Sequence, residues 1–286
     1  MNSEPTMSVN VDPTNPGQFF ACCGLLELAD RLWEGAEGWF EKSLMKFHVR
    51  TLNAEANSDQ LLESLATCDL CNTMKPDVLA EYVRLKAMSG KDRTKDEDAR
   101  KKDFDKQWRE LPLILHEPFG DFIIDWFLDS RAGGNRFKTW AGQQSVMNIA
   151  QDMKRPIEQG LYNDVPVTDW ISHTVGTGVD FNFDSDSSIQ SSALDVGFVL
   201  DPLGMNGATR PLLQMLAFIG LQRFRAAADT SNNAYTYVPW TTPLLPAVAA
   251  CVAANSVRLN NQTSFTFPLL YRTKYLKSFL PAKIGE

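Results

Sequence analysis

Apolar residues dominate the segment that follows a proline-rich turn near the start of the chain. Asn15 before Pro16 is typical of a helix N-cap followed by proline at the first helical position. Residues 19–33 are apolar on nearly every side until Glu27, and a helix that is apolar all round is buried. The pattern predicts a core helix over Phe19–Trp33, in which small residues at 21–24 permit close packing. Its large side chains should be buried: Phe19, Phe20, Leu25, Leu26 and Leu28.

Helical and extended patterns are interspersed along the rest of the chain. Apolar periodicity and start signals predict helices over residues 58–67, 76–88, 142–154, 211–224 and 244–254. Short apolar runs bounded by turn residues predict strands over residues 44–52, 113–116, 122–127, 179–183, 194–200, 235–240 and 264–271, the second and third forming a hairpin. Without a regular βαβ order, this favours an α+β fold with a mixed or antiparallel sheet around the buried N-terminal helix.

Charge is dense in residues 89–110, where both signs alternate. This is typical of a solvated helix or a loop. We therefore expect a single α+β domain over residues 1–286, with a charged loop or solvated helix at about 89–110.

Composition indicates an ordinary globular protein, with 44% apolar and 22% charged residues. Residues 1–16 are polar and do not resemble a secretory signal, and no apolar run approaches the roughly 18 residues of a membrane span. The five cysteines are odd in number and unevenly spaced. We expect reduced thiols in a cytoplasmic protein that has no membrane contact.

The net charge of −7 argues against nucleic-acid binding when it is taken alone. The distribution changes that picture, because residues 156–209 hold eight acidic side chains and no basic one. Residues 131–155 hold five basic and one acidic, residues 210–225 three basic and none acidic, and residues 258–283 five basic and none acidic. Such segregation suits a chain with one surface that faces phosphate, although the segments could instead mix and cancel on the folded surface.

Motifs for catalysis are scarce. The three histidines, His48, His116 and His173, have no metal-ligand spacing, and no Walker lysine or GxSxG motif is present. Cys68 and Cys71 form a CxxC, for which zinc would need two further ligands. Buried helix-face thiols are the simpler interpretation. We therefore expect a chain that is not an enzyme and has no cofactor.

One alternative is a magnesium-dependent nuclease. Clustered carboxylates hold magnesium in such enzymes, and Asp180, Asp184, Asp186 and Asp195 lie close together in the sequence. No lysine or histidine accompanies them nearby, and serines are interleaved between them. A solvated serine–aspartate loop therefore explains the segment better.

Residues 130–144 combine features that suit nucleic acid. They carry three cations and no carboxylate, as phosphate contact requires. Adjacent glycines allow close backbone approach, Phe137 and Trp140 could stack on an unpaired base, and amide side chains could read base edges. A surface loop with Trp140 packed in the core is the alternative. The candidate nucleic-acid-binding residues are Arg131, Gly133, Gly134, Asn135, Arg136, Lys138, Thr139, Trp140, Gln143 and Gln144.

Four segments resemble motifs of one family. Residues 11–29 (VDPTNPGQFFACCGLLELA) resemble its N-terminal signature, and residues 138–144 (KTWAGQQ) resemble a second motif. Residues 192–198 (SALDVGF) resemble a third, and Arg210-Pro followed by LAFIGLQRFR up to Arg225 resembles a fourth. On these motifs, in this order, the chain resembles the CRISPR-associated large-subunit family of type I-U Cascade.

The resemblance implies a non-catalytic subunit of a CRISPR RNA-guided surveillance complex for antiviral defence. Guide pairing supplies most of the sequence specificity in RNA-guided systems. The large subunit checks a short flanking motif, helps to open the duplex and helps to recruit a separate helicase-nuclease. The implied partners are other Cascade subunits, guide RNA, target double-stranded DNA and that helicase-nuclease. The nuclease and a purely structural adaptor stay open as alternatives.

Overall fold

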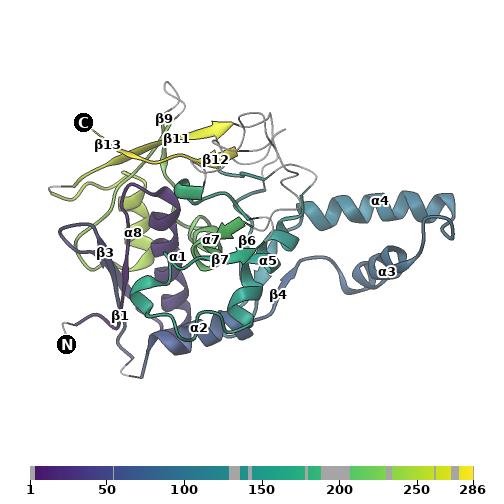
Figure 1. Cartoon of the computed structure of the whole chain (residues 1–286), viewed down its shortest axis with the longest axis horizontal. Helices are drawn as coiled ribbons and strands as arrows, with labels where there is room; N and C mark the ends of the chain where they lie inside the picture. The colour runs from purple at the N-terminus through teal and green to yellow at the C-terminus, as the bar shows by residue number, and fades with distance from the viewer. Residues whose placement is uncertain are drawn as a thin grey trace.

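The computed structural model describes residues 4–53, 55–128, 136–140, 144–177, 180–187, 207–229, 234–260, 262–271 and 277–285. Within these ranges, helices are interspersed with short strands that pair antiparallel (Figure 1). The predicted α+β class is confirmed. The strands belong to several small sheets rather than to one large sheet.

Helix α1 (Pro16–Trp33) lies in the centre of the body, as the sequence predicts (Figure 1). It begins where expected, because the Asn15 side chain accepts hydrogen bonds from the backbone N–H groups of Gly17 and Gln18. Its burial is complete over most of its length. The large side chains predicted to be buried are all 0% exposed: Phe19, Phe20, Leu25, Leu26 and Leu28.

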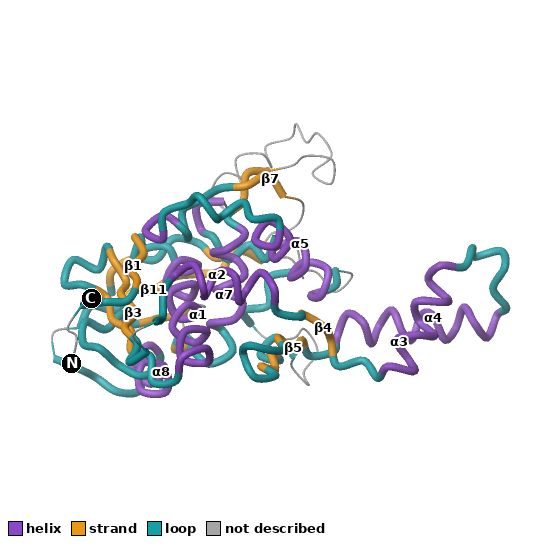
Figure 2. The backbone as a smooth tube through the Cα atoms, turned by 90° about the horizontal axis from the view of Figure 1, so that it is seen from below, coloured by secondary structure: helices purple, strands orange, loops and turns teal. Residues whose placement is uncertain are grey.

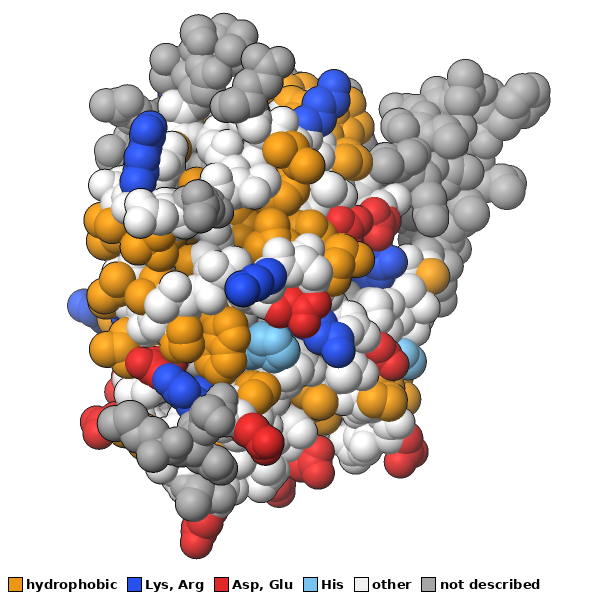
Figure 3. Space-filling view, turned by 90° about the vertical axis from the view of Figure 1, so that its left-hand side faces the viewer, with side chains coloured by type: hydrophobic (Ala, Val, Ile, Leu, Met, Phe, Trp, Pro, Cys, Tyr) orange, Lys and Arg blue, Asp and Glu red, His pale blue; other side chains and the backbone are white. Residues whose placement is uncertain are grey.

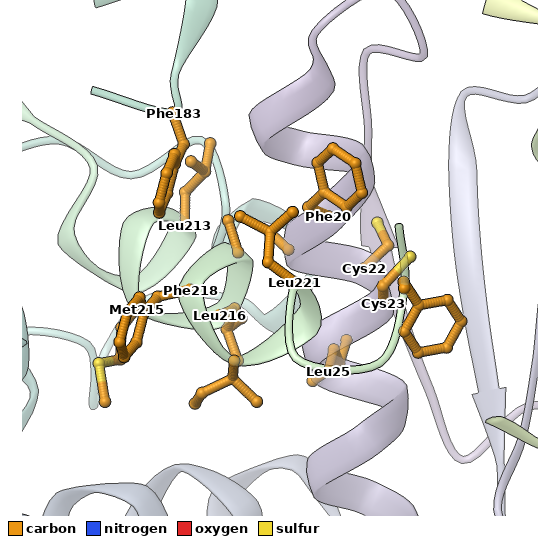
Figure 4. Close-up of a cluster of buried hydrophobic side chains, with 14 of the residues drawn as sticks. Phe20, Cys22, Cys23, Leu25, Phe183, Leu213, Met215, Leu216, Phe218 and Leu221 are labelled. Atoms are coloured by element: carbon orange, nitrogen blue, oxygen red, sulfur yellow. The ribbon is translucent and has the colours of Figure 1, made fainter. Parts of the chain in front are cut away.

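Helix α7 (Pro211–Gly220) packs against α1 at very short range (Figure 4). A Cβ atom built on Gly24 would lie 1.9 Å from the carbonyl oxygen of Leu216, and one built on Gly220 would lie 2.2 Å from that of Phe20. The two backbones therefore touch through reciprocal glycines, and the predicted close packing at residues 21–24 is found at Gly24. Leucine, phenylalanine and cysteine side chains fill the space on either side (Figure 4).

Two sheets flank this helix pair. The first has the order β1-β3-β2, formed by Met7–Asn10, Lys46–Arg50 and Glu37–Phe40. The second has the order β12-β11-β10-β9 with β13 also paired to β11. Its strands are Ala227–Asp229 (β9), Ala234–Tyr237 (β10), Phe265–Tyr271 (β11), Lys277–Phe279 (β12) and Lys283–Ile284 (β13).

A third sheet contains the predicted hairpin. Strands β5 (Leu113–Leu115) and β6 (Phe122–Ile124) pair antiparallel, and β4 (Leu70–Asn72) pairs with the other edge of β5. A two-stranded sheet joins β7 (Val175–Thr177) to β8 (Gly207–Thr209).

The remaining helices of the body follow the sequence closely. Helix α2 (Ser58–Thr67) has the predicted bounds, α8 covers Pro246–Ala253, and a 3-10 turn covers Val167–Asp169. Helix α5 (Val146–Glu158) begins later than predicted. The Ser145 hydroxyl caps it by accepting a hydrogen bond from the N–H of Asn148 at 3.4 Å.

One predicted strand is wrong over the residues that the structure describes. Residues 180–183 are not extended, because Asn182 adopts a positive φ of 56°. The Asp180 side chain accepts a hydrogen bond from the N–H of Asn182 at 2.9 Å, which favours a turn. The predicted strand 194–200 lies outside the described residues.

Helices α3 (Pro76–Ala87) and α4 (Lys95–Glu110) form a hairpin that projects from the body, here called the arm (Figures 1 and 2). Thr94 and Glu97 cap α4 by a reciprocal capping box. The arm has a small apolar cluster of its own around Tyr82 and Leu85, separate from the main core. From Lys95 onward, the charged segment predicted at about 89–110 is therefore a helix.

The five cysteines are all free, as expected. In the described ranges, no helix combines the length and the apolar character needed to cross a membrane.

Candidate nucleic-acid interface

Half of the candidate residues can be placed. Arg131, Gly133, Gly134, Asn135 and Gln143 lie outside the described residues. Arg136, Lys138, Thr139 and Trp140 lie in one short segment, residues 136–140, and Gln144 precedes α5.

Strand β12 holds the 136–140 segment through Lys277. The backbone N–H of Lys277 donates to the carbonyl of Thr139 at 2.9 Å, and the Lys277 ammonium donates to the carbonyl of Arg136 at 3.3 Å. Three cations from two separate basic segments of the sequence therefore meet at one place. We call Arg136, Lys138 and Lys277 the basic cluster.

The like charges of the basic cluster repel one another. The pKa of Lys277 is lowered by burial first, and then by the positive charges of Arg136 and Lys138. Within the described part of the chain, neither Arg136 nor Lys277 forms an ion pair with a carboxylate. Three cations held together in this way favour the binding of a phosphate, which would relieve their repulsion.

Aromatic rings lie beside the lysines of the basic cluster. The Lys138 ammonium lies 5.6 Å from the centroid of the Trp140 ring, and the Lys277 ammonium lies 5.6 Å from that of Tyr271. Both distances suit cation–π attraction. These contacts stabilise the charge of each ammonium without neutralising it.

Phe137 and Trp140 do not form a surface for stacking, which corrects that expectation. Phe137 is 7% exposed and its centroid lies 4.6 Å from that of Tyr235, while Trp140 is 2% exposed and lies 5.3 Å from Phe181. Apolar burial holds both rings in the core. Thr139 is also buried, and its hydroxyl donates to the carbonyl of Phe181. These three residues anchor the segment; Arg136 directly precedes the first anchor, and Lys138 lies between the first and the second.

Gln144 belongs to a different place. It lines a hollow of about 500 Å³ between the arm and α5, together with Trp108, Lys86 and Asn148. The lining that the structure describes includes neither Arg136 nor Lys138. The predicted set of site residues therefore divides between two locations.

Two of the four acidic residues considered for a nuclease, Asp184 and Asp186, lie in an ion-pair network. Asp184 is 1% exposed, and both of its carboxylate oxygens accept hydrogen bonds from Arg210, at 3.2 and 3.1 Å. Asn15 donates to the same carboxylate at 2.7 Å, and Asp186 lies 2.7 Å from the Arg210 guanidinium. We call Asp184, Asp186, Arg210 and Asn15 the neutralised cluster, because its carboxylates have a cationic partner inside the protein.

The other acidic candidates do not extend this network toward a metal site. Asp180 binds the N–H of Asn182, and Gln214 donates to it at 3.4 Å. Asp195 lies outside the described residues. Among the described residues, no group of three or more histidine, cysteine, aspartate or glutamate side chains could hold a metal ion.

A second buried carboxylate links α1 to the turn after α7. Glu27 is 1% exposed and forms ion pairs with Arg31, at 2.9 Å, and with Arg223, at 2.5 Å. Its hydrogen bonds raise the pKa of Arg223 above its usual value. On the face shown in Figure 3, basic and acidic side chains are interspersed among apolar ones. Charges of both signs are therefore mixed on this face.

Three of the four motifs behind the resemblance converge in the structure. Asn15 and Glu27, from the first motif, contact Asp184 and Arg223, and Arg210 and Arg223 belong to the fourth. Trp140, from the second motif, packs 6.3 Å from Phe218 of α7. Residues 192–198 lie outside the described residues. The motif residues that the structure describes therefore build the core and its ion pairs.

Sequence reasoning did not identify Lys277 as a site residue. Its signal is the run from Arg258 to Lys283, which contains five basic and no acidic side chains. That run could have indicated a cationic strand, but not its contact with residues 136–140.

No family model matches the chain, and neither a curated protein nor a solved structure matches it.

Proposed function

We propose that this chain is a non-catalytic subunit of a type I CRISPR RNA-guided surveillance complex, which binds target DNA through the basic cluster. In this proposal it helps to recognise the flanking motif, to open the duplex and to recruit the helicase-nuclease. It works in the cytoplasm with the other Cascade subunits and the guide RNA. The resemblance of the four motifs supports this family of complex, and the basic cluster supports the proposed contact surface.

The observation that carries the proposal is the meeting of Arg136 and Lys138 with Lys277. Like charges are brought together at a cost to the folded protein, since the pKa of Lys277 is lowered by its burial and by these neighbours. A protein can retain such an arrangement when a polyanion binds there. The phosphate backbone of a nucleic acid is the anion that suits three neighbouring cations.

The fixed geometry of the segment supports the same function. The buried residues Phe137, Thr139 and Trp140 hold residues 136–140 against β12. Less conformational entropy is therefore lost when Arg136 and Lys138 bind a phosphate than in a free loop. This arrangement predicts backbone contact that is independent of sequence. Base reading by Asn135 and Gln143 stays a prediction, since both lie outside the described residues.

The experiment compares target binding by the assembled complex, loaded with guide RNA, for the wild type and for R136A and K138A. Each substitution should weaken binding to a matched duplex about equally for all flanking sequences, because a lost phosphate contact carries no sequence information. Lys42 is an exposed lysine on the turn between β2 and β3, and K42A is the matched control. It should bind as the wild type does.

The same assay separates the alternatives. If R136A and K138A assemble and bind target as the wild type does, while the complex needs this chain, the chain is a structural adaptor and the proposed contact is wrong. Magnesium-dependent cleavage of labelled DNA by the purified chain, lost in D186N, would support the nuclease instead. Asp186 suits that test because its side chain is 43% exposed.

A further inference from the structure

A thiol, an imidazole and a carboxylate line up beside the third sheet. Cys71 lies on β4, His116 directly follows β5, and Asp121 directly precedes β6. The Cys71 Sγ atom lies 3.0 Å from His116 Nε2, and His116 Nδ1 lies 2.5 Å from an oxygen of Asp121. The sequence separates these residues by 45 and 5 positions, and the sheet brings them together.

The carboxylate determines which imidazole nitrogen carries the proton. An ionised carboxylate only accepts hydrogen bonds. In the neutral imidazole of His116, the nitrogen that faces Asp121, Nδ1, must therefore carry the proton. Nε2 then has a free lone pair that faces the Cys71 thiol, and the S–H group is the donor of that hydrogen bond. His116 is thereby oriented as a base toward Cys71, and Asp121 is its positioning residue.

Backbone contacts fix this arrangement. The N–H of His116 donates to the carbonyl of Asp69 at 2.9 Å, which holds His116 beside the start of β4. The N–H of Phe119 donates to the carbonyl of His116 at 3.1 Å, and Phe119 is buried at 1% exposure. Asp121 then adopts a positive φ of 49°, which directs the chain into β6.

The side chains of His116 and Asp121 are exposed, and Cys71 is partly exposed. Cys71 pairs with Ile114 and Ile114 pairs with Ile123, so these residues share one face of the sheet. Ile123 is 49% exposed on that face, and the side chains of His116 and Asp121 are 38% and 73% exposed. The opposite face, which includes Leu113 and Leu115, is buried.

Local electrostatics make the base necessary. Burial raises the pKa of the Cys71 thiol, and the negative charges of Asp69 and Asp121 raise it further. The thiol is therefore protonated at neutral pH, and its thiolate forms readily only if His116 accepts the proton. The same two carboxylates disfavour an anionic reagent and favour a neutral or cationic one.

We propose that Cys71 is a base-activated thiol that undergoes thiol–disulfide exchange with small neutral or cationic disulfides. His116 Nε2 takes the thiol proton while Cys71 Sγ attacks one sulfur of the reagent. The new S–S bond forms as the reagent's S–S bond breaks, and the departing thiolate takes the proton back from His116. The reagent supplies the oxidising equivalents, and the product is a mixed disulfide on Cys71.

The chain provides an internal comparison. Cys22 and Cys23 are 0% exposed and Cys68 is 3% exposed, so these thiols are shielded from reagent. Cys251 is exposed, and among the described residues no histidine contacts it. It is the reference for a solvent-exposed thiol of ordinary reactivity.

The test treats the full-length protein with cystamine, a cationic disulfide, and follows each cysteine by peptide mass spectrometry over time. Cys71 should form its mixed disulfide at least about tenfold faster than Cys251, and H116Q should remove that advantage. D121N should slow Cys71 by a smaller factor, and D121E should restore part of the rate. Glutathione disulfide, which is anionic, should react more slowly than cystamine at Cys71.

Circular dichroism and the thermal midpoint establish that each variant is folded, and the rate at Cys251 establishes that the reagent acts equally on all of them. A folded H116Q protein whose Cys71 reacts as fast as in the wild type would overturn the proposal. So would a wild-type Cys71 that reacts no faster than Cys251.

Discussion

The neutralised cluster and the basic cluster both join distant parts of the chain, but they treat charge in opposite ways. In the first, Arg210 meets the carboxylates of Asp184 and Asp186. In the second, Lys277 meets the cations Arg136 and Lys138, and its pKa is lowered by burial and by those charges. The first cluster satisfies its charges within the protein. In the second, no carboxylate among the described residues pairs with Arg136 or Lys277, which supports the proposal that an anion from outside binds there.

The comparison separates stability from function. An ion pair that loses one buried partner leaves an uncompensated charge, so removal of a buried member of the neutralised cluster should lower the stability of the folded protein. Removal of one cation from a group of neighbouring cations reduces the electrostatic repulsion in the folded state. Substitutions in the basic cluster should therefore affect binding without a loss of stability.

The largest effect is expected for D184A. The substitution removes the buried partner of Arg210, which keeps its ion pair with the more exposed Asp186, and it removes the acceptor of Asn15. The free energy of unfolding should fall by about 3–5 kcal/mol, as measured by chemical denaturation. D186A is the control and should cost about 1 kcal/mol or less, because Asp186 is 43% exposed. Equal costs for the two substitutions would contradict the account of this cluster.

Gly24→Ala should have the next largest effect, because it separates α1 and α7, whose N-cap residues Asn15 and Arg210 belong to the neutralised cluster. The added methyl group would lie 1.9 Å from the Leu216 carbonyl oxygen, so α1 and α7 must move apart. We expect a loss of about 2–3 kcal/mol in the free energy of unfolding. Gly176 has open space around it and no positive φ, so G176A is the control. A stable G24A protein would show that the close contact is not required.

Lys277→Met should change the free energy of unfolding in the opposite direction. It removes a partly buried ammonium that two neighbouring cations repel, so the free energy of unfolding should rise by about 0.5 kcal/mol at neutral pH. The folded-state pKa lies below the unfolded value, so the wild type gains stability as pH rises through the lowered pKa. K277M should lack that gain. Chemical denaturation from pH 7 to 10 measures both effects, and a destabilised variant at neutral pH would contradict them.

The smallest effect concerns the charge of Glu97 in the first turn of α4, on the arm. Hydrogen bonds from the Thr94 backbone and then from the Arg84 side chain lower the pKa of Glu97 to about 2. Its contribution is present above the unfolded pKa of about 4.3 and disappears as pH falls toward 2. E97Q should therefore increase hydrogen exchange in α4 slightly at pH 7, and less as the pH falls toward 2. The same increase at both pH values would show that the charge of Glu97 does not matter.

Local signals in the sequence predict much of the fold. Asn15 and Pro16 predict the start of α1, and helix α2 has the predicted bounds. The antiparallel pairing of β5 and β6 is confirmed as well. In each case the information lies in adjacent residues, as caps, prolines and apolar runs.

The candidate site is harder to predict, because its contacts are not local. The aromatic side chain of Trp140 is of a type that can stack on a base. Whether it is buried depends on its contacts with Phe181 and α7, which are distant in the sequence. Lys277 reaches Arg136 across 141 positions of sequence. The base that faces Cys71 is 45 residues away. Spacing along the chain contains no information about such pairs, since the sheets determine them.

The most direct test of the central claim is the salt dependence of target binding by the assembled complex. The logarithm of the association constant falls linearly with the logarithm of salt concentration, with about 0.9 units of slope for each phosphate contact. The variant R136A/K138A/K277M should lower the magnitude of that slope by about 2–3 units relative to the wild type and to K42A. An unchanged slope in a complex that still assembles would contradict phosphate binding by the basic cluster.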